Sequence, residues 1–396
     1  MKTKFFFLAV AAVALASCSN DETVEVNQGD AISFRPFVAN VTRAADAHFN
    51  ASGDQFKVTA FETGGVANTY FSDVVFQGDG TTFTSTTNKY YWPSGYNLDF
   101  WAYAPVSNDQ ITYVLKADDA TNYYKKFTVT PSPTASDQVD LVYARTNDWG
   151  KAALQTGTAA THQIGSTYTG VTINFRHAES KVAIALLNSN SNLKFTVSNV
   201  VIGNVDGTGT FVFGETSTDG QDDANITSGW TPSGTTTAVY SQSISPYVVT
   251  GSGVQQGVDM ILIPQTLSKQ TVYGAATAYD YDTPANTPNS IFKGAYIAVD
   301  LKIQNNATGG DAAYIVGAAS GAKEYVRAIW PLEANVWAPG YKYTYTVDLA
   351  GGGYYYENQD SSEDLDPILE GAEIKFVTVT VDNWDASGIS VSGPTL

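Results

Sequence analysis

Histidine side chains are the first residues of this sequence to test for acid–base or metal chemistry. The three histidines are His48, His162 and His177, and none has another at the spacing of helical metal ligands. No HExxH, GxSxG, P-loop or GxGxxG pattern occurs. His177 follows Ile173 and Phe175 in phase, so we expect a buried or hydrogen-bonded structural histidine. We predict that the protein is not an enzyme and that it holds no metal and no cofactor.

Acidic residues gather in places that could bind a cation or hydrolyse a glycosidic bond. A glycosidase needs two carboxyl groups that face each other across a cleft, which a local pair does not establish. The acidic group nearest the C terminus, at 360–366, could bind Ca²⁺ through its oxygens, but it has no recognised loop pattern. We expect solvated acidic loops, and an exported hydrolase is the least favoured function. The groups are Asp118 with Asp119, Asp222 with Asp223, and Asp360, Glu363, Asp364 and Asp366.

Cys18 is the only cysteine, which excludes an intrachain disulfide framework and multi-cysteine metal sites. The chain starts with the basic MKTK, continues with the apolar run FFFLAVAAVALA and reaches the cysteine in LASC. This succession is typical of a bacterial lipoprotein signal, in which the thiol is acylated and the chain is cut before it. We predict a signal peptide at 1–17 and a lipid on Cys18. An ordinary secretory peptide with a chance cysteine is less favoured, because all three regions of the signal fit.

The stretch SNDETVEVNQGD after Cys18 is polar and acidic and has no basic residue. Two explanations stay open: a flexible, solvated tether, or a sorting signal that resembles the acidic export signal of some lipoproteins of the Bacteroidota. The apolar run before the cysteine is shorter than the ~18 to 20 residues that span a bilayer as a helix, and no later segment is long and apolar enough. We expect an anchored protein that does not span the membrane.

The charge balance is strongly acidic. Lys and Arg total 21 against 39 Asp and Glu, a formal net charge of −18. Affinity for nucleic acid comes mainly from clustered Lys and Arg, so a nucleic-acid partner is excluded. Charge of this size keeps a surface soluble until a specific contact overrides it.

Period-two alternation recurs along the chain, and no sustained helical stripe accompanies it. The segments VTINF, KVAIAL, IAVDLKI and YKYTYTVDL each have one apolar face, so the fold class is all-β with antiparallel sandwiches. A polar run rich in Gly and Thr at 151–168 is the best boundary. We predict an N-terminal domain at 44–165 and a C-terminal domain at 166–396. The clearest strand places on one face Tyr341, Tyr343, Tyr345, Val347 and Leu349.

A set of local patterns, in this order, resembles the fimbrillins, the subunits of type V pili of the Bacteroidota. After LASC come AISFRPFVANVTRAAD, YYWPSGYNLDFWAYAP, DLVYAR, INFRHAESKVAI, MILIPQTL, VWAPGYKYTYTVDL and IKFVTVTVDNW. The resemblance covers nearly the whole chain, and the order is more specific than any single piece.

The resemblance implies two transthyretin-like β-sandwich domains and assembly by strand exchange. In a fimbrillin-like precursor, the first strand fills a groove of its own N-terminal domain until an arginine- or lysine-specific protease removes it. The C-terminal strand of a neighbouring subunit then occupies the groove, so other subunits would be the partners of a head-to-tail homopolymer.

The segment ISFRPFV agrees with a removable strand in the tether and first-strand region 18–43. Ile32, Phe34 and Val38 fall on one face, and Pro36 lacks an N–H and therefore belongs on a sheet edge.

Arg43 is the expected processing site, with the mature chain starting at Ala44. The neighbouring residues are small, so a protease could hold them in extended form, whereas Arg35 is followed by a proline that hinders cleavage. A solvated loop arginine is the alternative interpretation of Arg43.

The C-terminal region offers two apolar strands. VTVTVDNW is either a donor or the last strand of the chain's own sheet, and the tail beyond Gly388 supplies Ile389 and Val391 as the expected donor strand. We predict a pilus subunit that supports adhesion, made as an outer-membrane lipoprotein precursor and assembled into a cell-surface fimbrium. The alternative is a non-polymerising surface lipoprotein that binds glycans.

Overall fold

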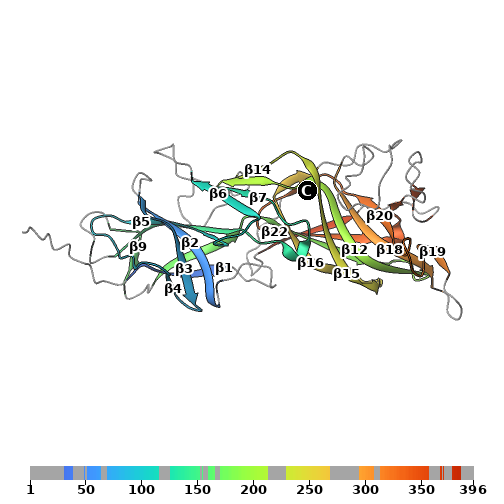
Figure 1. Cartoon of the computed structure of the whole chain (residues 1–396), viewed down its shortest axis with the longest axis horizontal. Helices are drawn as coiled ribbons and strands as arrows, with labels where there is room; N and C mark the ends of the chain where they lie inside the picture. Colours follow the sequence, from blue (N-terminus) through green and yellow to red (C-terminus); the bar gives the residue numbers. More distant parts are fainter. Residues whose placement is uncertain are drawn as a thin grey trace, which may run out of the picture.

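The computed structural model describes residues 31–38, 49, 51–63, 69–115, 125–151, 154, 159–165, 170–212, 229–267, 294–306, 313–355, 366–367, 369 and 377–384. Within them the chain is all-β, as predicted, and it also contains short 3-10 turns. The molecule is elongated: strands β2 to β5 and β9 lie toward one end, and β12, β15 and β18 to β20 toward the other (Figure 1). In the described part of the chain, no helix is long and apolar enough to cross a membrane.

The first sheet closes on itself. Its eight strands follow the order β10-β1-β4-β3-β2-β5-β8-β9, and β10 also pairs with β8. The strand β1 therefore has a neighbour on each side, β10 in parallel and β4 in antiparallel orientation. The strands of this sheet are β1 (Ser33–Val38), β2 (Ser52–Glu62), β3 (Thr69–Asp79), β4 (Phe83–Ser85), β5 (Leu98–Ala104), β8 (Val142–Lys151), β9 (His162–Ile164) and β10 (Val171–His177).

An aromatic core fills this closed sheet. Alternate residues of its strands point inward, because side chains of a strand alternate between faces. The fully buried phenylalanines of this core are Phe34, Phe56, Phe76, Phe83, Phe100 and Phe175.

A second, four-stranded sheet covers the outer face of the first around β2, β5 and β8. It has the order β14-β13-β7-β6 and encloses a second apolar cluster, to which Trp101, Tyr103 and Tyr143 of the first sheet contribute. Strands β5 and β8 are therefore buried on both faces, which explains the nearly continuous apolar run LDFWAYA. The covering strands are β6 (Ile111–Leu115), β7 (Lys125–Val129), β13 (Gly209–Val212) and β14 (Trp230–Pro232).

The C-terminal half is built from two sheets around one core. A four-stranded sheet, β16-β11-β22-β25, faces a seven-stranded sheet that contains the path β15-β12-β18-β20-β23-β24. The strand YKYTYTVD alternates as predicted, with Tyr343, Tyr345 and Val347 buried in this core. The strands are β11 (Ser180–Leu187), β12 (Leu193–Asp206), β15 (Thr236–Val248), β16 (Val254–Leu262), β18 (Tyr296–Asn305), β19 (Tyr314–Val316), β20 (Val326–Pro331), β22 (Tyr341–Asp348), β23 (Tyr354–Tyr355), β24 (Asp366–Pro367) and β25 (Thr378–Asn383), and a separate pair is β17 (Gln265–Leu267) with β21 (Asn335–Trp337).

Two sheets combine strands from both sides of residue 165, where the sequence predicted a domain boundary. The strand β10 belongs to the first sheet although it begins at Val171, and β13 joins β6 and β7 although it begins at Gly209. Strand β10 continues into β11 after two residues, so one stretch of chain links the two halves of the molecule.

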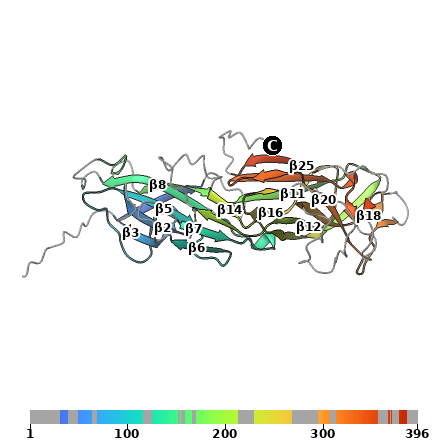
Figure 2. The same ribbon diagram turned by 90° about the horizontal axis from the view of Figure 1, so that it is seen from above.

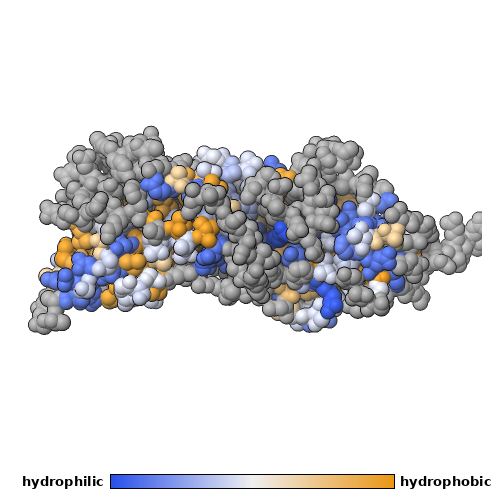
Figure 3. Space-filling model, turned by 180° about the vertical axis from the view of Figure 1, so that it is seen from behind, coloured by the Kyte–Doolittle hydropathy of each residue, from blue (hydrophilic) through white to orange (hydrophobic). Residues whose placement is uncertain are grey.

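The described surface has few large apolar side chains. In the view from behind, hydrophobic and hydrophilic residues are interleaved along the molecule (Figure 3). Isolated apolar residues of this kind are normal on a protein surface. Those most exposed among the described residues are Val248, Val254, Tyr314, Ile315 and Val336.

Candidate functional site

The position of β1 between β10 and β4 is the candidate site, and we call it the first-strand slot. The strand runs parallel to β10 from Phe34, opposite Val171, to Val38, opposite Phe175. Its pairing with β4 is short and involves Ser33 and Phe34. The slot is therefore closed on both sides at its start, and beyond Phe34 the strand ladder continues along β10 alone.

Phe34 fills an aromatic pocket within the slot. Its ring makes edge-to-face contacts with Phe76 at 4.7 Å, Phe100 at 5.1 Å and Phe56 at 5.8 Å between ring centroids. Ile32 is also buried, and its backbone N–H donates to the carbonyl of Tyr90 at 2.7 Å. The predicted inward face of this strand is thus confirmed for its first two residues, and the side chain of Val38 lies outside the described residues.

The expectation that β1 is an edge strand was wrong at its start. Phe34 is paired on both sides, because the first sheet closes around β1. Pro36 has β10 as its strand partner, opposite Ile173, so the missing N–H of the proline falls where no pairing with β4 is needed. A strand in this position is held both by backbone pairing and by the burial of Phe34.

Strand β25 resolves the open question about VTVTVDNW. It pairs antiparallel with β22, from Thr378 opposite Thr346 to Asn383 opposite Tyr341. This segment therefore belongs to the chain's own C-terminal sheet, in which it is the last strand among the described residues. Figure 2 shows β25 along the C-terminal half of the molecule. The donor strand predicted beyond Gly388 lies outside the described residues, which end at Trp384.

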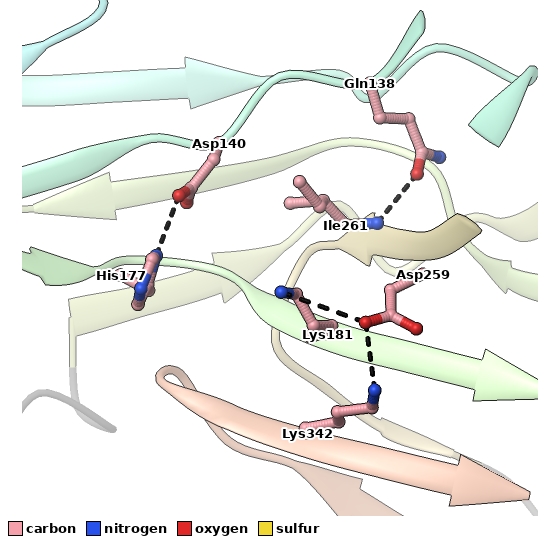
Figure 4. Close-up of polar contacts among 7 residues, drawn as sticks. All are labelled: Gln138, Asp140, His177, Lys181, Asp259, Ile261 and Lys342. Atoms are coloured by element: carbon pink, nitrogen blue, oxygen red, sulfur yellow. Dashed lines mark hydrogen bonds and ion pairs between the residues drawn. The ribbon is translucent and has the colours of Figure 1, made fainter. Parts of the chain in front are cut away.

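A buried polar network joins the two halves where β10 passes into β11 (Figure 4). The ring nitrogen Nδ1 of His177 lies 2.7 Å from Oδ2 of Asp140, and both side chains are 1% exposed. Glu179 accepts a hydrogen bond from the backbone N–H of Leu141 at 2.8 Å. His177 is thus a buried structural histidine, as its phase in the sequence predicted.

Asp259 holds two lysines in the same region. Its Oδ2 lies 3.0 Å from Nζ of Lys342 and 3.8 Å from Nζ of Lys181, and the Asp259 and Lys181 side chains are 4% and 3% exposed. Buried charges are tolerated when they are paired, so this arrangement ties β11, β16 and β22 together. Gln138 adds a bond by accepting from the backbone N–H of Ile261 at 2.7 Å.

Trp384 covers this network at the end of β25. Its ring stacks on His177 with 3.9 Å between centroids and 2° between planes, and Nζ of Lys181 lies 4.6 Å from its centroid. Its backbone N–H donates to the carbonyl of Gly340 at 2.8 Å. The start of the C-terminal tail is therefore fixed beside the last residue of β10, the strand that lines the first-strand slot.

Burial raises the pKa of Glu179 well above its usual value of 4.5, and the nearby charge of Asp140 raises it further. The bond from Leu141 and the proximity of His177 act in the opposite direction. A carboxyl whose pKa is higher in the folded than in the unfolded protein stabilises the folded state while it is protonated. Its contribution to the free energy of unfolding is therefore complete below pH 4.5 and is lost as pH rises through the pKa of the folded protein.

Glu179→Gln is accordingly expected to gain stability relative to the wild type as pH rises. We expect the difference in free energy of unfolding to shift in favour of the variant by about 1 kcal/mol or more between about pH 5 and about pH 8. Urea unfolding at both pH values measures it. Parallel stability curves for the two proteins would contradict the buried-carboxyl interpretation.

The other histidine that the structure describes is also structural. His162 in β9 stacks on Trp149 with 4.9 Å between ring centroids, and its Nδ1 lies 3.1 Å from the carbonyl of Asn147. No group of three or more His, Cys, Asp or Glu side chains among the described residues could hold a metal ion.

Several predicted site residues lie outside the described residues. They are Cys18, Arg43, Ala44, His48, Asp118, Asp119, Asp222, Asp223, Asp360, Glu363, Asp364, Ile389 and Val391. The sequence patterns did not predict that Asp140, His177 and Trp384 meet, although INFRHAESKVAI contains His177 and VTVTVDNW contains Trp384. The signal that could have indicated this junction is the pair of charged residues Arg176 and Glu179, which lie shortly before the predicted strand KVAIAL.

Several solved structures resemble this chain at low sequence identity. The chain is 14% identical to a fimbrial protein from Bacteroides vulgatus, with a TM-score of 0.47 over 89% of this chain and 99% of that one. It is 18% identical to a putative cell adhesion protein from Bacteroides uniformis, with a TM-score of 0.40 over 89% and 98%. For the tip fimbrial protein Mfa3 from Porphyromonas gingivalis, the identity is 10% and the TM-score 0.34 over 90% and 100%.

No curated protein sequence matches the chain. The model of the fimbrillin-like family matches residues 42–384, which include both halves of the structure and end at Trp384. Because this match covers most of the sequence, the chain belongs to the fimbrillin-like family.

Proposed function

We propose that this protein is a non-enzymatic structural subunit of a surface pilus that joins its neighbours by strand exchange and supports adhesion. Membership of the fimbrillin-like family supports a pilus-type surface protein. The observation that carries the finer proposal is the first-strand slot. A strand at the N-terminal end of the described chain places Phe34 in the centre of an aromatic core.

Loss of β1 would leave a vacant slot in which the binding of a replacement strand is favourable. The backbone groups of β10 and β4 would lose their partners, and the pocket between Phe56, Phe76 and Phe100 would open. Unpaired strand edges and exposed apolar pockets are unfavourable in water. An extended peptide gains main-chain hydrogen bonds at such an edge and places alternate side chains in its pockets.

Maturation is the step that would empty the slot. In this proposal, Cys18 is lipidated and holds the precursor at the outer membrane, and an arginine-specific protease cuts between Arg43 and Ala44. The cut lies beyond the last residue of β1, Val38, so the released piece contains the whole strand. In this proposal the mature chain starts at Ala44 and forms two transthyretin-like domains, the first of which includes β10, β13 and β14 from beyond residue 165.

The donor is the C-terminal tail of a neighbouring subunit. Ile389 and Val391 alternate with serines, so a strand there would present two apolar side chains on one face. A tail that fills the slot of the next subunit makes a head-to-tail contact, which does not close and therefore extends into a fibre.

Trypsin treatment of the purified Cys18→Ser protein tests the proposal. We expect N-terminal sequencing of the resistant fragment to begin at Ala44, and denaturant-resistant ladders to form afterwards. A chain that ends at Asp385, and the double variant Ile389→Asp with Val391→Asp, are expected to form no ladders, because burying two unpaired carboxylates is unfavourable.

The double variant Ser390→Asp with Ser392→Asp is the matched control, since it adds the same two carboxylates on the opposite face of the tail, and it is expected to form ladders. Equal ladders from truncated and full-length protein, or cleaved full-length protein that stays monomeric at every concentration, would contradict strand exchange. A non-polymerising glycan-binding lipoprotein would then be favoured.

A further inference from the structure

The direction of the chain at Trp384 leads toward the first-strand slot of the same molecule. Strand β22 runs parallel to β11, and β25 runs antiparallel to β22. Since β11 continues β10, strand β25 ends pointing in the direction opposite to that of β10. Trp384 already touches His177, the last residue of β10.

The edge of β10 that holds β1 leads directly to β22. The N–H of Ala178 donates to Leu141, which precedes β8, whereas the carbonyl of the next residue, Glu179, accepts from Gly340, which precedes β22. Gln138, which also precedes β8, accepts a hydrogen bond from the backbone of Ile261 in β16, the partner of β11 opposite β22, so β8 and β16 follow one edge of the β10–β11 stretch. Because β10 pairs with β1 and β8 on its two edges, β1 and β22 lie end to end along the same edge.

The tail is long enough to fill the slot. Fully extended, residues 385–396 span roughly 40 Å at ~3.3 Å per residue, whereas the six residues of β1 need roughly 20 Å. Ser390 lies as many positions after Trp384 as Val171 lies before His177 along β10. Directly opposite residues of paired strands share a face, so a register one residue further along, with Val391 opposite Val171 and Ile389 opposite Ile173, turns both apolar side chains inward at the level of Phe34. In that register Ser390 lies opposite Thr172 and faces outward.

We propose that, once the first strand is removed, residues 385–396 fill the slot of their own subunit, antiparallel to β10, and cap it as a monomer. This inference rests on the proposed loss of β1. The cap competes with the neighbour's tail, so polymerisation requires opening and is slow in dilute solution. Tethering beside the slot gives the tail an effective concentration of order millimolar, which a free neighbour must exceed.

Disulfide trapping tests the cap on the full chain with Cys18→Ser. Thr172→Cys on β10 is combined with Ser390→Cys, because Thr172 is opposite the exposed Arg35 and Ser390 faces outward when its neighbours fill the pocket. A recognition sequence for a site-specific protease is inserted after Val41, so that removal of β1 does not depend on Arg43. Mild denaturant releases the cut strand before oxidation, and mass spectrometry measures monomer and multimer cross-links over a range of concentrations.

We expect a cross-link within one chain that requires cleavage and whose yield does not change with dilution. The control pair Thr172→Cys with Thr380→Cys is expected to give no cross-link, since Thr380 of β25 is already paired with Thr344 of β22. Cross-links only between chains would overturn the cap and leave strand exchange standing. Absence of both kinds after verified cleavage would overturn the cap and the proposed donor together.

Trp384 provides a second measurement, as the residue that fixes the root of the tail. Trp384→Ala removes the stack on His177 and the contact with Lys181, and we expect the within-chain cross-link to fall about five-fold. Trp384→Phe keeps a ring and is expected to restore most of the yield. An unchanged yield in Trp384→Ala would show that the tail reaches the slot without this anchor, against the proposal.

Discussion

Replacing Phe34 by alanine in the uncleaved protein is expected to lower the free energy of unfolding by about 3 to 5 kcal/mol. The ring is fully buried and meets three other phenylalanines edge to face. Its removal loses the transfer free energy of the ring and leaves a cavity between strands of a closed sheet, where relaxation is limited. Urea unfolding measured by tryptophan fluorescence gives the difference.

Arg35→Ala is the matched control, because Arg35 is the next residue of the same strand and is exposed. Surface substitutions usually change stability by about 0.5 kcal/mol or less. If both variants lost the same small amount, β1 would not be seated in the core, and a vacant slot would be no driving force for assembly.

Asp259→Ala is expected to be the most damaging removal of a charge, at about 3 to 5 kcal/mol. The carboxylate is buried and lies within 4 Å of two lysines, one of which, Lys181, is itself buried. Without Asp259 that ammonium group loses a buried carboxylate as its neighbour, which is more costly than losing a favourable contact at the surface. The expected result is a lower urea midpoint at an unchanged slope.

Glu324→Ala provides the comparison. Glu324 lies 2.7 Å from Nζ of Lys302, closer than either lysine lies to Asp259, but its side chain is 32% exposed. Pairs near the surface contribute roughly 0 to 1 kcal/mol because water screens them. Equal losses from the two variants would mean that burial does not decide the strength of these ion pairs.

Local patterns predicted the strand content well. The alternation in YKYTYTVDL became β22 with its apolar residues inward, and VTINF, KVAIAL and IAVDLKI became parts of β10, β11 and β18. The phase of His177 also predicted its burial. Such features depend on neighbours two residues apart, which the sequence displays directly.

The same patterns did not predict which strands pair with one another. ISFRPFV showed that one strand exists and which residues face inward, but Pro36 suggested an edge, whereas the closed sheet places β4 on one side and β10 on the other. Strand β10 begins after residue 165 and still completes the first sheet, because Phe34 pairs with Val171, more than a hundred positions away.

The sequence by itself determined that this chain is acidic and rich in alternating strands, and it is the basis of the prediction that Cys18 carries a lipid, since each rests on composition or short spacing. Only the tertiary structure decided that Phe34 sits among three other phenylalanines and that Trp384 lies on His177. Contacts of this kind depend on how sheets close and pack, because the free energy of burial is shared among residues that are distant in the chain.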